Sequence, residues 1–261
     1  MRVVYIWILA CLLTYAAPID IAPKLKIYRM PDALSSKIDW RSDTQLYVSS
    51  LGLWISAEKN IYRLDKPSKA LMTPLHVSSF TLDQSGHPIA IVDGQLGVIS
   101  HGFFLPSLKL PMSGFSLIAG PNDTLYLYNT TMPAPIYHFD GKLITPIALP
   151  NEAVQALTYV DNTVIFATRE GVFSLESGKP LGLIMPLPDF TTILSIAANP
   201  DTAELFLSTR DTVYSLSNGL MVPLVTGIGG KVAFYDNCLW IADPVRHQVY
   251  IVMLNQFQKK S

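Results

Sequence analysis

A short apolar motif recurs six times along the chain and gives the sequence its main regularity. Apolar and polar positions alternate around Tyr62, Val98, Tyr137, Phe173, Tyr214 and Tyr250, which are 36, 39, 36, 41 and 36 residues apart. A second strand-like run precedes each copy, as at residues 53–56 and 239–242, and a turn signal such as Asp140-Gly141 follows five copies. Repeats of about 38 residues, built from short strands and tight turns, predict an all-β fold, a six-bladed β-propeller with four-stranded blades.

The repeat also predicts where the blades lie and how the ring closes. The blades are expected near residues 40–75, 76–111, 112–150, 151–188, 189–225 and 226–254. In the fourth unit the strands are expected at 153–159, 163–168, 171–175 and 181–186. Residues 25–30 carry the same pattern ahead of the first unit, so we expect them to pair beside residues 249–254 and to cover an otherwise open edge. Residues 255–261 are expected to form a polar tail.

Prolines give an independent indication of the outer strands. Proline cannot donate a hydrogen bond to a strand ladder, so it is tolerated at sheet edges and excluded from central strands. The outer strands of the first five units are therefore expected to contain Pro74, Pro111, Pro146, Pro186 and Pro223.

The first residues are typical of an export signal. After Met1 and Arg2, residues 3–15 are uncharged and strongly hydrophobic, and Ala16-Ala17 supplies small residues for cleavage. This run is shorter than the roughly 20 residues that a membrane-spanning helix needs. We predict a signal peptide at 1–16, a single propeller domain at 17–254, and a secreted or periplasmic protein without stable membrane insertion. An uncleaved anchor and lipid attachment at Cys11 are the alternatives.

Composition narrows the classes of partner. Charged residues make up only 15% of the chain, and 19 basic against 20 acidic residues give a net charge of −1, which argues against nucleic-acid binding. Cleavage would leave Cys238 as the only cysteine, so no internal disulfide is expected. Asn122 and Asn129 begin glycosylation sequons, which matter only if the source is eukaryotic.

The runs Leu53-Trp54-Ile55-Ser56 and Leu239-Trp240-Ile241-Ala242 make the chain resemble the six-bladed propellers of the NHL, SMP-30 and streptogramin-lyase group, over residues 24–254. Through residues 168–175 and 209–216 it also resembles, more weakly, the secreted ommochrome-binding proteins of insects.

The resemblance to the NHL, SMP-30 and streptogramin-lyase group has implications for the site. Its lactonase-type members hold a divalent cation with carboxylate and amide oxygens, and its lyase-type members use a histidine as acid or base. The first property implies a calcium or magnesium site, for which turn residues are the candidates: Glu58, Asn60, Asp93, Glu170, Asp211 and Asp243. None of the five histidines matches a motif of the group, so no catalytic residue and no metal ligand is assigned.

The turns between the second and third strands of each blade should converge on one face of the ring. The binding-face candidates there are Glu58, Arg169, Glu170, Arg210, Asp211, Asp243, Arg246 and His247. Arginines on neighbouring blades suit a carboxylate or phosphate, and His247 suits proton transfer. Asp and Asn are also ordinary turn residues, and pairing of each arginine with its acidic neighbour is the commoner arrangement. We therefore expect an exported non-catalytic propeller that binds a small molecule or a protein partner. The alternative is a metal-assisted hydrolase or lyase using calcium or magnesium.

Overall fold

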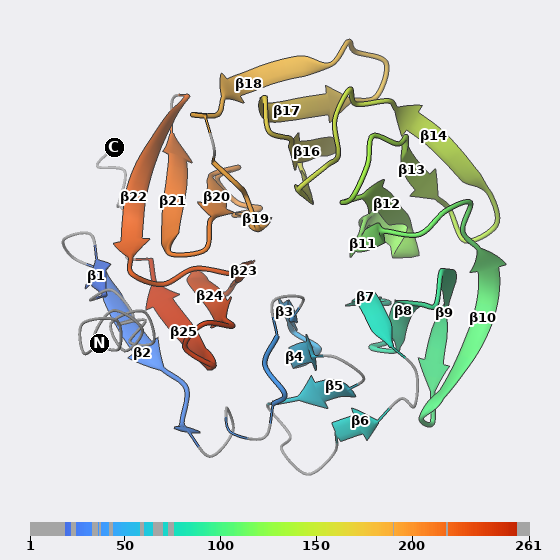
Figure 1. Cartoon of the computed structure of the whole chain (residues 1–261), viewed down its shortest axis with the longest axis horizontal. Coiled ribbons are helices and arrows are strands. Elements are labelled where there is room, and N and C mark those ends of the chain that lie inside the picture. Colours follow the sequence, from blue (N-terminus) through green and yellow to red (C-terminus); the bar gives the residue numbers. More distant parts are fainter. Residues whose placement is uncertain are drawn as a thin grey trace, which may run out of the picture.

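Six antiparallel sheets surround a central axis like the blades of a propeller (Figure 1). The computed structural model describes residues 19–21, 25–32, 36, 38–41, 44–57, 60–64, 70–72, 76–189, 191–217 and 219–254. The predicted signal peptide, the polar tail, Glu58 and Pro74 lie outside the described residues. The all-β, six-bladed architecture is confirmed. None of the described helices is long and apolar enough to cross a lipid bilayer.

Each of the first five blades runs from an inner strand at the axis to an outer strand at the rim. The first blade contains β3 (Gln45–Ser49), β4 (Gly52–Ala57), β5 (Asn60–Arg63) and β6 (Ala70–Met72). The second contains β7 (Val77–Leu82), β8 (Pro88–Val92), β9 (Gln95–Ser100) and β10 (Phe103–Lys109). The third contains β11 (Phe115–Ala119), the short 3-10 turn η1 (Pro121–Asp123), β12 (Leu125–Asn129), β13 (Ile136–Phe139) and β14 (Ile144–Ala148). The fourth contains β15 (Ala156–Val160), β16 (Thr163–Ala167), β17 (Gly171–Glu176) and β18 (Gly182–Pro186). The fifth contains β19 (Ser195–Ala198), β20 (Leu205–Ser208), β21 (Thr212–Ser217) and β22 (Leu220–Thr226).

The sixth blade joins the two ends of the propeller domain. It contains β23 (Lys231–Tyr235), β24 (Cys238–Asp243) and β25 (Gln248–Met253), and its outer strand is β2 (Lys26–Arg29) from the start of the chain. Ile27 pairs with Val252, and the Met30 N–H donates to the Val249 carbonyl at 2.9 Å. This confirms the predicted closure. A further strand that the sequence did not indicate, β1 (Asp20–Ile21), extends the fifth blade beside β22.

The outer strands contain prolines, although one prediction was wrong. Pro106, Pro146 and Pro223 lie inside β10, β14 and β22, and each adjoins a shift in pairing register with the third strand. Pro186 ends β18. Pro111 instead follows β10, which ends at Lys109. Proline and bulge together interrupt the outer ladder, so these edges are poor templates for pairing with another chain.

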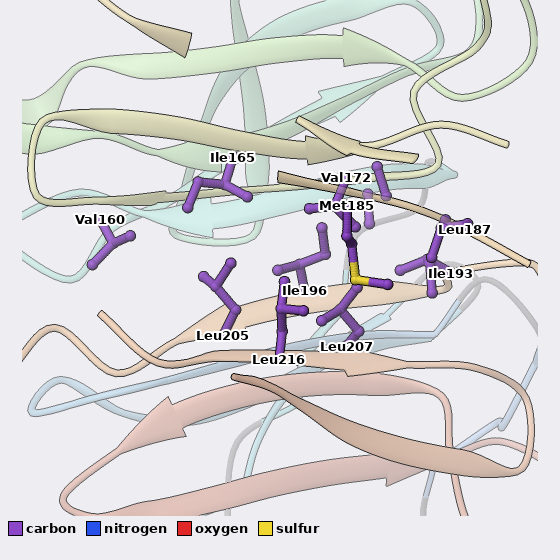
Figure 2. Close-up of a cluster of buried hydrophobic side chains, with 12 residues drawn as sticks. Val160, Ile165, Val172, Met185, Leu187, Ile193, Ile196, Leu205, Leu207 and Leu216 are labelled. Carbon is purple, nitrogen blue, oxygen red and sulfur yellow. The ribbon is translucent and has the colours of Figure 1, made fainter. Parts of the chain in front are cut away.

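The hydrophobic core is divided among the junctions between blades. At the junction of the fourth and fifth blades, Ile165, Val172 and Met185 meet Ile196 and Leu207 (Figure 2). Three tryptophans also pack between blades. Trp54 lies at the junction of the first and second blades, whereas Trp40 and Trp240 lie where the sixth blade meets the first.

Candidate functional site

One end of the ring carries the turns that the sequence singled out. Because every blade is an antiparallel meander in the same order, the turn between its second and third strands lies where its inner strand begins. We call this end the turn face. It comprises the turns after β8, β12, β16, β20 and β24, with the loops that lead into the inner strands. The loops and turns are tied together, since the Gly230 N–H donates to the Thr209 carbonyl at 2.9 Å and the Leu187 N–H to the Glu170 carbonyl at 3.1 Å.

Asp243 is the most deeply buried of the described candidates, with 0% of the residue exposed. Its Oδ1 accepts hydrogen bonds from the backbone N–H groups of Val245 at 2.8 Å and Arg246 at 3.0 Å. Its Oδ2 accepts no hydrogen bond and lies 3.6 Å from Arg246 Nη1. Burial raises the pKa of Asp243, opposed by the N–H donors and by the Arg246 charge. The carboxylate therefore stabilises its own turn through Oδ1, while its buried Oδ2 is left without a hydrogen bond.

The acidic groups of the fourth and fifth blades also bond to nearby backbone and hydroxyl groups. Glu152 Oε2 accepts a hydrogen bond from the Arg169 N–H at 3.2 Å. Asp211 Oδ1 accepts hydrogen bonds from the hydroxyl groups of Thr209 and Thr212, both at 3.2 Å. These bonds fix the shape of the turns.

His247 lies against an aromatic ring at the seam of the propeller. Its imidazole stacks on the Trp40 indole, with ring centroids 6.4 Å apart and 7° between the planes. Its backbone has a φ of 54°, the left-handed conformation of a turn. The stacking places the imidazole at the junction of the sixth and first blades.

The turn-face candidates do not converge on the central channel. Glu58 lies outside the described residues, and none of the other seven candidates lines the channel cavity. Among the residues that the structure describes, no group of three or more His, Cys, Asp or Glu side chains is placed to hold a metal ion.

The channel itself contains a cavity of about 350 Å³ that all six inner strands line. Its aromatic lining is Tyr47, Phe80, Tyr128, Tyr159 and Phe234, and its polar lining includes Gln45, Thr81, Thr158, Ser195 and Lys231. Burial raises the pKa of Tyr128 to about 12, opposed by the hydrogen bond of its hydroxyl with Ser116. The channel therefore combines apolar ring surface with hydrogen-bonding groups, among which Lys231 is charged.

Side chains from neighbouring blades bind the inner edges of the channel strands. Ser79 Oγ accepts a hydrogen bond from the Leu117 N–H at 3.1 Å, and Gln155 Oε1 from the Ile193 N–H at 2.8 Å. Lys231 Nζ donates to the Leu194 carbonyl at 2.8 Å. An inner strand has no partner strand on its channel side, so these bonds satisfy backbone groups that the sheet cannot. These hydrogen bonds between blades were not predicted from the sequence. Polar side chains in or beside the expected inner strands were the feature that could have indicated them.

Cys238 is not deeply buried. It is the first residue of β24 and is half-buried, next to the exposed turn at Asp236 and Asn237. Burial, and to a smaller extent Asp236, raises the pKa of the thiol. The thiol therefore stays protonated at neutral pH, which lowers its reactivity.

Comparison with solved structures places the chain among known propellers. A catalytically inactive virginiamycin B lyase from Staphylococcus aureus, solved with quinupristin, matches with a TM-score of 0.63 and 15% identity over 82% of each chain. A gluconolactonase from Xanthomonas campestris matches with a TM-score of 0.63 and 11% identity over 93% of this chain and 99% of that one. A chain of the mitotic checkpoint complex matches with a TM-score of 0.60 and 11% identity over 92% and 94%. No protein-family model and no curated protein matches the sequence. At these identities the likeness is one of fold: the chain is a β-propeller, with structural neighbours that include a streptogramin-type lyase, a lactonase and a component of a protein complex.

Proposed function

We propose that this chain is an exported, non-catalytic binding module that takes a small organic molecule in its central channel. The observation that carries the proposal is the cavity of about 350 Å³, lined by all six inner strands. Ligand sites in proteins usually occupy about 300–1,000 Å³ and combine apolar walls with a few placed polar groups. The channel fits that description, and each blade contributes to it.

The lining favours a flat, partly polar ligand. Tyr47, Tyr159 and Phe234 contribute aromatic surface to the channel wall, and Thr158 contributes a hydroxyl group. Tyr159 and Phe234 also stack between the blades, on Tyr126 and Phe206, which holds their rings in place. A ring system that carries hydrogen-bonding substituents satisfies both kinds of surface. A purely aliphatic molecule would use only the apolar part of this surface.

Titration with the fluorescent probe 1-anilinonaphthalene-8-sulfonate tests this proposal. We expect saturable binding of about one molecule per chain. The variant Ala233→Trp, which fills part of the channel, should weaken binding at least about tenfold, a difference of about 1.4 kcal/mol.

The matched control is Phe103→Ser on the rim. Phe103 is 72% exposed on β10 and is an alternative apolar surface for the probe. The control should bind the probe as the wild type does. Binding that Phe103→Ser removes and Ala233→Trp leaves intact would contradict the proposal. Circular dichroism and a cooperative melt establish that each variant is folded.

A metal-assisted hydrolase or lyase is the second candidate function. The Oδ2 of buried Asp243, which accepts no hydrogen bond, is the observation that favours it, together with the lyase and lactonase among the structural neighbours. The melting temperature should then rise with calcium or magnesium, fall back with EDTA, and lose its cation response in Asp243→Ala and Glu170→Ala. A melting temperature that does not respond to either cation would count against this function.

A further inference from the structure

Two sequons of identical chemistry flank strand β12 in the third blade. Asn122 lies in η1 before the strand, and Asn129 is its last residue. Thr124 and Thr131 complete the two triplets. The structure places the two asparagine side chains in opposite environments.

The Asn129 side chain is buried and hydrogen-bonded within the fold. The residue is 1% exposed, and its Nδ2 donates to the Ser113 carbonyl at 2.7 Å. Its Oδ1 accepts hydrogen bonds from the N–H and the hydroxyl of Thr131, at 2.9 and 2.8 Å, and from the Met132 N–H at 3.0 Å. The amide thereby organises the loop between β12 and β13. A sugar on Nδ2 would collide with Ser113 and would remove the side chain from the interior.

Asn122 is displayed at the surface. It is exposed, it has the left-handed backbone conformation φ 54°, ψ 45°, and its side chain makes no hydrogen bond among the described contacts. The turn around it is fixed, because Asp123 Oδ1 accepts a hydrogen bond from the Gln84 N–H at 2.8 Å and the Thr124 hydroxyl donates to the Pro121 carbonyl at 2.7 Å. As a turn between the first and second strands, it lies at the opposite end of the ring from the turn face.

We propose that, in a eukaryotic secretory pathway, Asn122 is an N-glycosylation site of this chain and Asn129 stays unmodified in the folded protein. In the reaction, Asn122 Nδ2 bonds to the anomeric carbon of a lipid-diphosphate-linked oligosaccharide. The bond from that carbon to the diphosphate breaks, Nδ2 loses a proton, and the lipid diphosphate leaves. The glycan projects from the end of the ring opposite the turn face.

The glycan is transferred before the chain folds, but folding still decides which glycosylated chains are secreted. A glycan on Nδ2 draws the Asn129 side chain out of the interior, so the Ser113 carbonyl, the N–H and hydroxyl of Thr131 and the Met132 N–H lose their bonds to it. Chains modified in this way are retained and degraded rather than secreted. A glycan on Asn122 leaves every described hydrogen bond in place.

The test uses the full chain secreted from cultured eukaryotic cells behind an established signal sequence, so that a failure of the chain's own leader cannot affect the result. Peptide mass spectrometry after enzymatic deglycosylation in ¹⁸O water should mark Asn122 and leave Asn129 unmarked. Asn122→Gln and Thr124→Ala should each remove the glycan's mass. Thr124→Ser, which keeps the sequon, and Thr131→Ala, which removes the other sequon, should keep it.

Secreted wild-type protein with an unmodified Asn122 would overturn the proposal. A glycan on Asn129 in folded, secreted protein would overturn it equally. Thr131→Ala leaves Asn129 in place, so a glycan lost in this variant would assign the modification to Asn129.

Discussion

Ser195 and Val232 join the fifth and sixth blades through two hydrogen bonds between one side chain and one backbone unit. The Val232 N–H donates to Ser195 Oγ at 3.1 Å, and Ser195 Oγ–H donates to the Val232 carbonyl at 3.3 Å. The two residues are 37 positions apart, and the comparable bonds at Ser79 and Gln155 span 38. The period of the sequence is therefore also the period of the contacts that hold neighbouring blades together.

Replacing Ser195 with alanine should destabilise the propeller. The change leaves a backbone N–H and C=O at a blade junction without these partners, which costs about 1–3 kcal/mol. Urea unfolding should show the loss. The control is Ser177→Ala in an exposed turn, expected within about 0.5 kcal/mol of the wild type. Equal stabilities for the two variants would refute the role assigned to the bond.

Removing strand β2 should open the ring, whereas removing only β1 should not. A chain that begins at Leu25 keeps the ladder between β2 and β25, and a chain that begins at Pro31 loses it. The shorter chain exposes Tyr250 and Val252, and each fully buried side chain of this size contributes about 1.5–3 kcal/mol. We expect a loss of at least about 3 kcal/mol for it in denaturant unfolding.

A synthetic peptide of residues 25–31 supplies the control for that truncation. Added to the chain that begins at Pro31, it should raise the melting temperature in a concentration-dependent way. If both truncated chains melt together with the full chain, β2 does not close the propeller.

The charge of Asp243 should reduce stability as pH rises. Burial raises its folded-state pKa above about 3.9, the ordinary value for aspartate, so the native state holds the proton to a higher pH than the unfolded state does. Stability from this group is therefore greatest below about pH 4 and declines as pH rises through the folded pKa. Relative to Asp243→Asn, the wild type should lose free energy of unfolding over that window.

Asp243→Ala separates the charge from the turn. Alanine removes the acceptor for the Val245 and Arg246 N–H groups, which asparagine retains. It should destabilise the protein by about 1–3 kcal/mol at every pH. A wild type that gains stability over Asp243→Asn with rising pH would show that the ion pair with Arg246 outweighs burial.

Gly229→Ala should be far more costly than a matched glycine replacement. A Cβ on Gly229 would lie 2.2 Å from the Thr209 carbonyl oxygen and 2.7 Å from the Arg210 carbonyl carbon, so backbone must move. Overpacking of this kind costs about 1–3 kcal/mol. At Gly182 the nearest atom is the Ser174 hydroxyl oxygen at 2.9 Å, which can rotate away. Calorimetric melts of the two variants should differ by several degrees, and identical melts would contradict the close approach.

The fold could be predicted from sequence because its determinants are local and repeated. The alternation around Tyr214 and Tyr250, and prolines such as Pro146 and Pro223, specify strands and edges without knowledge of neighbours. Pro111 misled because a proline just after an outer strand has the same sequence signature as one inside it.

The site was harder to predict, because exposure and bonding depend on the next blade. Asp243 belongs to a charged turn in the sequence, yet its carboxylate is buried, and N–H groups of its own turn and of Gly229, in the loop from the fifth blade, oppose the rise in its pKa. Ser195 looks like an ordinary strand residue until Val232 is placed beside it. The sequence pattern of a single repeat does not predict the contacts that form between neighbouring repeats.

Anomalous diffraction from crystals soaked in 4-bromobenzoate tests the central claim most directly. The aromatic ring fits the walls formed by Tyr47, Tyr159 and Phe234, and the carboxylate can accept hydrogen bonds from the polar lining. The account predicts a bromine peak inside the channel, between the inner strands, in wild-type crystals and none there in Ala233→Trp. Bromine peaks confined to the rim strands, with an empty channel, would contradict it.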